Sequence, residues 1–240
     1  MKKSISLCLA ILLMTGVCRN VLAAARNVSN AGRDYVVAAP ALNSLSCGVY
    51  GDNAQNDITV SSIPTRLETS KIMAYLGVDV LPWLTPYVTV GTGSSKFDDG
   101  PSKSQGVYGL GIQLKFLDHE IPDPGLLEDR LRLNANAEYT WRGAADWMGE
   151  DLKWQELNAS LTVGIVNDVN GNALFIPDSI AIYCGPIYTA LSGSEIGGDG
   201  RTDFGFCAGL EVFYTKRVAF YGQINKQDND GYSVGLNIHF

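Results

Sequence analysis

The sequence predicts an all-β fold built from about ten antiparallel strands. Apolar and polar residues alternate with period two in one segment after another, which is typical of strands with two different faces. Segments rich in turn-forming residues separate these strands, and no stretch of useful length shows the period of an amphipathic helix. The chain has 240 residues, of which 46% are hydrophobic and 18% are charged, so its composition suits a folded domain rather than a disordered one.

The first 25 residues predict a secretory signal peptide, which is removed from the mature chain. Lys2 and Lys3 supply the positive start, residues 5–17 supply the apolar core, and Ala23–Ala25 supply small residues for cleavage. The apolar run is shorter than the roughly 18 residues that a membrane-spanning helix needs. The alternative is lipid attachment at Cys18, which lacks the small preceding residue that such sites favour.

Ten candidate strands follow within residues 45–240, and the last is the clearest. From Tyr232 to Phe240, apolar residues occupy every second position, and small or polar residues lie between them. The alternation is weakest in 179–191, where Pro186 interrupts it. Two long turns leave eight or twelve strands as alternatives. The predicted strands are 45–52, 70–80, 87–96, 107–116, 131–142, 155–166, 179–191, 204–214, 218–226 and 232–240.

Three features indicate that the apolar faces point outward into lipid. The polar faces are rich in glycine, which weakens a solvent-exposed strand but suits the crowded interior of a narrow barrel. Aromatic residues such as Tyr108 and Phe116 stand at the two ends of an apolar face, and tilted strands of this length span about 20–25 Å. An even number of strands lets the sheet close without edges. The predicted fold is therefore a closed antiparallel transmembrane β-barrel.

The chain as a whole resembles the bacterial outer-membrane β-barrel superfamily, in the size class of the small OmpA-like barrels. The resemblance rests on the export signal, the amphipathic strands and the closing segment GYSVGLNIHF. It implies a Gram-negative outer-membrane location, contact with outer-membrane lipid, and recognition of the last strand by the barrel assembly machinery. The residues that match this assembly signal are Tyr232, Val234, Leu236, Ile238 and Phe240.

The same resemblance places the C-terminus in the periplasm and so orients every connection. Residues 26–44 are then a periplasmic N-terminal tail that precedes the barrel of 45–240. The extracellular loops carry most of the Asp, Glu, Ser and Gly residues outside the strands. They are predicted at 53–69, 97–105, 143–154, 192–202 and 227–230, and the periplasmic turns are predicted at 81–86, 117–129, 167–178 and 215–217.

Charged residues on the polar faces are the most informative candidate site. Because an unpaired buried charge costs several kcal/mol, we expect Lys115 and Arg132 to pair with Glu211 or Asp79. Such a network either fills the lumen as a polar plug or acts as a gate or selectivity ring in a narrow channel, and we favour the plug. The predicted lumen charges are Asp79, Lys115, Arg132, Glu138, Arg142, Glu156 and Glu211.

The sequence predicts no catalytic, cofactor or metal site. The mature chain has two histidines: His119 is expected in a surface turn, and His239 is expected to be packed in the lumen. Neither lies beside a serine or carboxylate on an extracellular strand end, where a barrel hydrolase would need it. Cys184 and Cys207 are a candidate disulfide across a hairpin, which leaves Cys47 as a free thiol.

These observations predict a non-catalytic barrel with a structural or surface-interaction role, exerted through acidic extracellular loops. A narrow porin-like diffusion channel is the first alternative, and a barrel enzyme that acts on lipid or peptide is the second. Loss of the first 25 residues takes the net charge from −7 to −10, because that segment holds three basic residues and no acidic ones. A net charge of this sign argues against nucleic acid as a partner. The sequence does not name a surface ligand.

Overall fold

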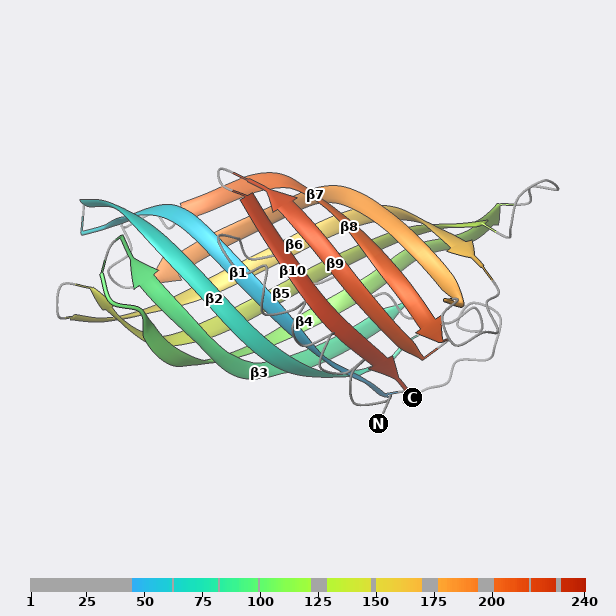
Figure 1. Cartoon of the computed structure of the whole chain (residues 1–240), viewed down its shortest axis with the longest axis horizontal. Coiled ribbons are helices and arrows are strands. Elements are labelled where there is room, and N and C mark those ends of the chain that lie inside the picture. Colours follow the sequence, from blue (N-terminus) through green and yellow to red (C-terminus); the bar gives the residue numbers. More distant parts are fainter. Residues whose placement is uncertain are drawn as a thin grey trace, which may run out of the picture.

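The computed structural model describes residues 45–61, 63–81, 83–98, 100–121, 129–147, 150–169, 177–193, 201–215, 217–227 and 230–240. Ten strands form one antiparallel sheet that closes on itself, because β1 pairs with both β2 and β10 (Figure 1). This confirms the predicted all-β barrel of ten strands. The strands are β1 (Leu45–Val60), β2 (Ile63–Val78), β3 (Leu84–Phe97), β4 (Lys103–Ile121), β5 (Asp129–Trp147), β6 (Glu150–Asp168), β7 (Ser179–Gly193), β8 (Arg201–Thr215), β9 (Val218–Lys226) and β10 (Asp230–His239).

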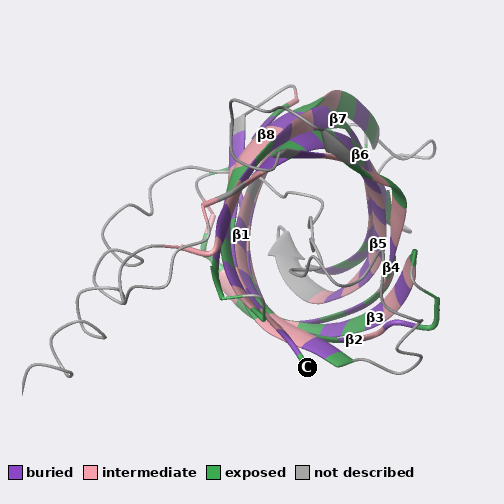
Figure 2. Cartoon of the chain, turned by 90° about the vertical axis from the view of Figure 1, so that its right-hand side faces the viewer, coloured by how far each residue is buried: buried purple, intermediate pink, exposed green. Residues whose placement is uncertain are grey.

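Along most of the barrel, polarity is inverted relative to a soluble protein. Figure 2 looks along the barrel and shows a ring of strands in which buried and exposed residues alternate. The inward, buried positions are largely polar, whereas large apolar side chains face outward, with Phe204 74% and Ile72 67% exposed. In the described part of the chain, no helix is long and apolar enough to cross a membrane.

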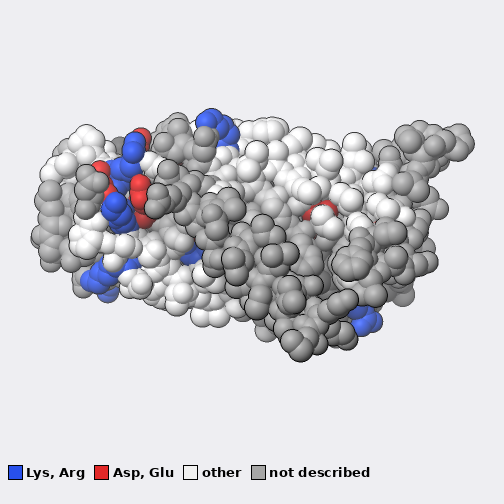
Figure 3. All heavy atoms as spheres, in the orientation of Figure 1, with Lys and Arg blue, Asp and Glu red and all other residues white. Residues whose placement is uncertain are grey.

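The polarity reverses near one end of the barrel. We call the end that carries Leu45 and Phe240 the terminal end, and the end that carries the β1–β2 turn the distal end. Near the distal end the inward side chains become apolar and the outward ones polar, as in a soluble barrel. Figure 3 shows charged atoms gathered at this end, where the β1–β2 turn lies in Figure 1. We call this part the distal collar. Its outward charged residues include Asp57, Arg66, Glu68, Lys96 and Lys153.

The collar corrects several predicted connections. The loop predicted at 53–69 is wrong, because β1 and β2 continue to a tight turn after Val60. The loop predicted at 143–154 is wrong as well, since β5 reaches Trp147 and β6 begins at Glu150. At the terminal end, the predicted turn at 117–129 is too long, because β4 extends to Ile121. In the collar the strands remain paired although their outward residues are polar. Strand ends predicted from outward apolar residues therefore come too early.

Aromatic side chains mark both ends of the outward apolar band. Toward the distal end, the Tyr108 and Trp141 rings stack with centroids 5.8 Å apart, and the Tyr139 ring meets Trp141 edge-on at 4.7 Å. Toward the terminal end, large aromatic side chains are again exposed. They are Trp83, Phe116, Tyr214, Phe220 and Phe240.

Inside the barrel, tyrosine rings lie across glycines of the neighbouring strand. Tyr87 on β3 is paired directly with Gly111 on β4, and a methyl group added to Gly111 would stand 2.1 Å from Cζ of the Tyr87 ring. The Tyr87 hydroxyl then donates to Asn136 Oδ1 on β5 at 2.8 Å, so the side chain links three strands. The same arrangement occurs at two more places. Tyr75 crosses Gly48 to reach Asn237, and Tyr183 crosses Gly209 to reach Gln223.

Substitution of Gly111 by Ala is expected to destabilise the barrel by about 1–3 kcal/mol, because the added methyl group displaces the Tyr87 ring from its contact with β4. Gly222→Ala is the matched control, since an added methyl group there meets no atom within 4 Å. Equilibrium unfolding by urea in lipid vesicles measures both variants. Equal stability of the two would show that the tyrosine rings do not depend on the glycines beneath them.

Candidate functional site: the charged lumen

A cluster of charges joins opposite walls of the barrel beneath the distal collar. Lys71 Nζ on β2 lies 3.1 Å from Asp52 Oδ2 on the adjacent β1 and 3.8 Å from Glu156 Oε1 on β6. In the ring of ten strands, β2 and β6 are four strands apart, so Lys71 reaches across the lumen. We call the set Asp52, Lys71, Glu138, Arg142 and Glu156 the distal charge cluster.

The remaining members of the distal charge cluster are also hydrogen-bonded. Arg142 donates to Glu156 Oε2 from Nη2 at 2.7 Å and from Nε at 3.0 Å. Glu138 Oε1 on β5 accepts from the Tyr50 hydroxyl on β1 at 2.8 Å and from the Thr89 hydroxyl on β3 at 3.0 Å. The Tyr50 contact spans four strands, so it is a second bridge across the lumen. Buried charges persist when each one has partners of this kind.

An apolar cluster covers the distal charge cluster on its distal side. The Phe97 ring on β3 and the Trp154 ring on β6 meet edge-on with centroids 6.3 Å apart, again from different walls. The Arg142 guanidinium carbon lies 5.8 Å from the Trp154 ring, which connects the two layers through a cation–π contact. We call the set the distal apolar cluster. It comprises Ile58, Val60, Leu67, Phe97, Leu152, Trp154 and Leu191, each at most 5% exposed.

A second group of charges lies near the terminal end. The Asp118 carboxylate forms ion pairs with Arg130, whose Nη2 lies 3.1 Å away, and with Arg132, whose Nε lies 3.2 Å away. His239 Nε2 lies 2.9 Å from Asp79 Oδ2, and the Thr85 hydroxyl donates to the same carboxylate. The His239 contact ties β10 to the turn after β2, because Asp79 directly follows that strand.

The seven lumen charges predicted from the sequence do not gather at one site. Glu138, Arg142 and Glu156 belong to the distal charge cluster, and the other four lie toward the terminal end. Arg132 forms an ion pair with Asp118, a partner that the sequence analysis did not predict. The Lys115 amino group is buried on β4, and Glu211 is buried on β8.

Sequence reasoning missed four members of these groups. Asp52, Lys71 and Arg130 stand at or just outside the ends of the predicted strands, although their parity already indicated the inward face. Asp118 could not be found this way, because a bulge between Lys115 and Leu117 shifts the register and turns the next residue inward.

The candidate disulfide is corrected by the structure. Cys47, Cys184 and Cys207 are free thiols. Cys184 faces outward and Cys207 is fully buried on the inward face, one register position apart, so their side chains point to opposite sides of the sheet. Among the described residues, no group of three His, Cys, Asp or Glu side chains is placed to hold a metal ion.

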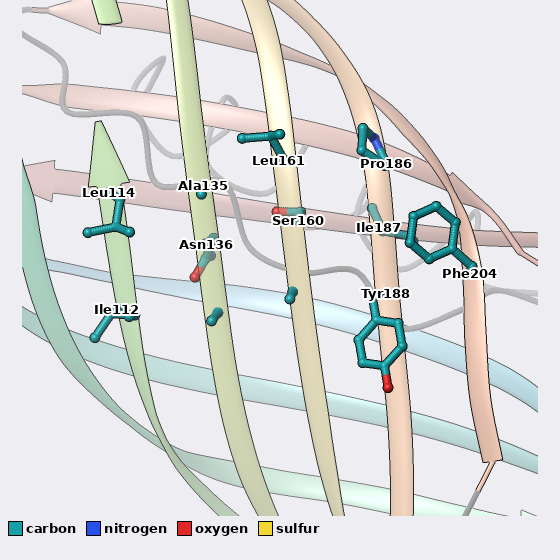
Figure 4. A pocket seen from close by; sticks show the side chains of 12 residues that line it. Ile112, Leu114, Ala135, Asn136, Ser160, Leu161, Pro186, Ile187, Tyr188 and Phe204 are labelled. Atoms are coloured by element: carbon teal, nitrogen blue, oxygen red, sulfur yellow. The ribbon is translucent and has the colours of Figure 1, made fainter. Parts of the chain in front are cut away.

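An apolar groove of about 360 Å³ lies on the outward face of β4 to β8. Its floor is formed by alanines at positions 135, 137 and 159, and larger side chains such as Leu161, Pro186 and Phe204 surround it (Figure 4). Most lining residues occupy outward positions, so the groove is a feature of the lipid-facing surface rather than of the lumen. The five assembly-signal residues from Tyr232 to Phe240 also face outward, and Phe240 is 64% exposed.

Comparison with known proteins finds no matching family model and no matching curated protein. Solved structures give distant likenesses. The β domain of the Bordetella autotransporter BrkA has 9% identity and a TM-score of 0.42, over 83% of this chain and 99% of its own. An outer-membrane channel from Pseudomonas putida F1 has 13% identity and a TM-score of 0.42, over 89% and 100%. The Escherichia coli protease OmpT has 9% identity and a TM-score of 0.36, over 86% and 100%. Similarity this low carries no argument about function.

The physical character of the two faces decides the class of protein. The outward face is an apolar band bounded by aromatic residues, whereas the lumen is polar and its charges are paired. This combination is stable only where lipid replaces water around the sheet. The chain forms a transmembrane β-barrel. The barrel closes without an open edge within the apolar band, because β10 pairs with β1 from Ser46 to Asn53.

Proposed function

We propose that this barrel is a non-catalytic surface protein with a sealed lumen, which acts through its distal collar. The observation that carries the proposal is the contact between opposite walls. Lys71 on β2 reaches Glu156 on β6, and Tyr50 on the adjacent β1 reaches Glu138 on β5, so each contact joins strands that are four positions apart in the ring. We propose that these contacts close the lumen to solutes at this level.

The distal apolar cluster supports a sealed lumen. Trp154 is 2% exposed and Val60 is fully buried, although both side chains point into the barrel near its distal end. A conducting pore needs polar groups that replace the hydration shell of an ion, or enough width to keep that shell. An apolar layer above a paired charge network offers neither.

We assign the collar to the outside of the cell. In the outer-membrane barrels that this chain resembles, the C-terminus lies on the periplasmic side. The distal end of this barrel is then extracellular. The described collar carries both signs of charge, so we assign the surface role to the whole collar rather than to acidic loops alone.

The placement of the histidines supports the absence of catalysis in this proposal. His119 is exposed and faces outward on β4 near the terminal end, away from the lumen. His239 contacts Asp79 and stands opposite Ser46 in the strand register, which brings the residue types of a hydrolytic triad together. All three of these residues are buried, so they present no surface to a substrate.

The last strand completes the proposal. Its outward row ends at the exposed Phe240, as the assembly signal of outer-membrane barrels requires, so we assign recognition by the barrel assembly machinery to this row.

Wild-type protein in a planar lipid bilayer is expected to give no discrete conductance steps, because the wall-to-wall contacts block the lumen. Heat-dependent migration in SDS gels shows in parallel that the protein is folded. Reproducible steps from the folded protein would overturn the proposal and favour the narrow channel. In that case Lys71→Ala should change the conductance, whereas Lys153→Ala, which alters an exposed outward side chain, should not.

A further inference from the structure

The distal collar contains a strand edge that no described strand covers. β1 pairs with β2 along its whole length, as far as Val60. On its other side, β10 pairs with β1 only as far as Asn53. Figure 1 shows the β1–β2 hairpin reaching further toward the distal end than β9 and β10. Residues 54–60 therefore have one paired side and one open side in the described part of the chain.

The register shows which backbone groups point to the open side. At the start of β1, Leu45 faces β10, because its carbonyl accepts from the Phe240 amide at 2.9 Å. Backbone groups of an antiparallel strand alternate between its two neighbours, and no bulge interrupts β1 in its pairing with β2. Gln55, Asp57 and Thr59 thus direct three N–H and three C=O groups to the open side.

The strand end that faces the open side of β1, at the start of β8, is protected by a side chain. The unprotected open side of β1 is therefore unusual. β8 also extends past its neighbour, since its pairing with β9 begins only at Phe206. There the Gln227 side chain donates to the Asp203 carbonyl at 3.2 Å and to the Thr189 hydroxyl at 3.1 Å. Strand edges are commonly blocked by proline or lysine, and residues 54–60 contain neither.

We propose that the open side of β1 binds an extended segment of another polypeptide as an added antiparallel strand. This inference rests on the proposed surface role and specifies its partner. An added strand would place one side chain directly opposite Asp57, whose carboxylate is exposed and has only a 3.5 Å surface contact with Arg66. A Lys or Arg in that position is favoured by the cross-strand charge pair. The flanking positions would face the lumen side beside Ile58, so they should be apolar.

A second copy of this chain does not fit the same edge. Copies in one membrane are related by rotation about the membrane normal, and that rotation leaves both β1 strands running toward the distal side. The two β1 edges would then be unable to form an antiparallel pair, and the uncovered start of β8 is blocked by the Gln227 side chain. The partner is therefore a segment that reaches the collar from outside the membrane.

The test uses a fluorescent blocked peptide, Val-Thr-Val-Lys-Val-Thr-Val, and the refolded full-length barrel in detergent micelles. Fluorescence anisotropy is expected to show binding that falls about tenfold when the central Lys is replaced by Asp. N-methylation of the central Lys removes a donor aimed at β1 and should weaken binding about tenfold. N-methylation of an adjacent Val, whose N–H points away from β1, should leave binding unchanged.

Three variants of the barrel make the test specific to the edge. Thr59→Pro removes an N–H on the open side without removing a bond to β2, and it should weaken peptide binding about tenfold. Thr59→Ala keeps that N–H and is the matched control. Asp57→Lys should reverse the preference toward the Asp-centred peptide. Absence of binding, or binding that is indifferent to N-methylation and to Thr59→Pro, would overturn the inference. A silent bilayer recorded alongside such a result would leave the sealed-barrel function standing.

Discussion

Truncation of Glu156 to Ala is expected to destabilise the folded barrel by about 3–5 kcal/mol. Glu156 accepts from Arg142 and lies within 3.8 Å of Lys71, so its removal leaves two cations in a buried site with less compensating charge. Urea unfolding in lipid vesicles, followed by tryptophan fluorescence, measures the change in free energy of unfolding. The expected loss is large because Glu156, Lys71 and Arg142 are all buried at this level.

Lys153→Ala is the control for Glu156→Ala. Lys153 stands on the same strand but faces outward in the distal collar, where it is exposed, and loss of its charge should change stability by less than about 0.5 kcal/mol. If Glu156→Ala cost no more than this control, the charges would have to be solvated by water in an open lumen. That outcome would contradict the sealed-lumen proposal together with the buried network.

Substitution of Ile112 by Arg is expected to cost about 2–4 kcal/mol in a bilayer. Ile112 faces outward on β4, midway between Tyr108 and Phe116 at the two margins of the apolar band. An arginine there must leave water for the middle of the hydrocarbon layer. Urea unfolding in vesicles gives the cost.

Ser104→Arg is the matched control, because Ser104 lies on the same strand and the same face but beyond Tyr108, in the collar. Its arginine stays in water, and the expected cost is about 0–1 kcal/mol. Equal costs at positions 104 and 112 would place the membrane elsewhere on the molecule, or would show that the outward face does not contact lipid.

The number of strands and the direction of their faces could be predicted from the sequence. Between Tyr108 and Phe116, for instance, every second residue is apolar, and the residues between them are small or polar. A sheet with that pattern can turn its apolar face inward, as in a soluble barrel, or outward into lipid. The glycine-rich polar face favours the barrel with lipid outside. The structure places the same apolar residues outward.

The candidate site was predictable only in part. Parity places Arg142 and Glu156 on the inward face, but it does not say that Glu156 meets a lysine four strands away. Such a contact depends on barrel closure, which brings β2 opposite β6. The partner of Arg132 illustrates the same limit, since a single bulge in β4 turned Asp118 inward, where it forms an ion pair with Arg132.

By itself, the sequence determined the strand content, the lipid-facing residues and the polar character of the lumen, because all three follow from alternation along one strand. The tertiary structure alone decided the height of the barrel and the partners of its lumen charges. Beyond the membrane the pattern inverts, with Ile58 and Val60 turned inward and Asp57 outward, so a search for outward apolar residues ends at the lipid boundary. Whether charges seal the lumen depends on distances between strands far apart in the chain, and those distances exist only once the ring has closed.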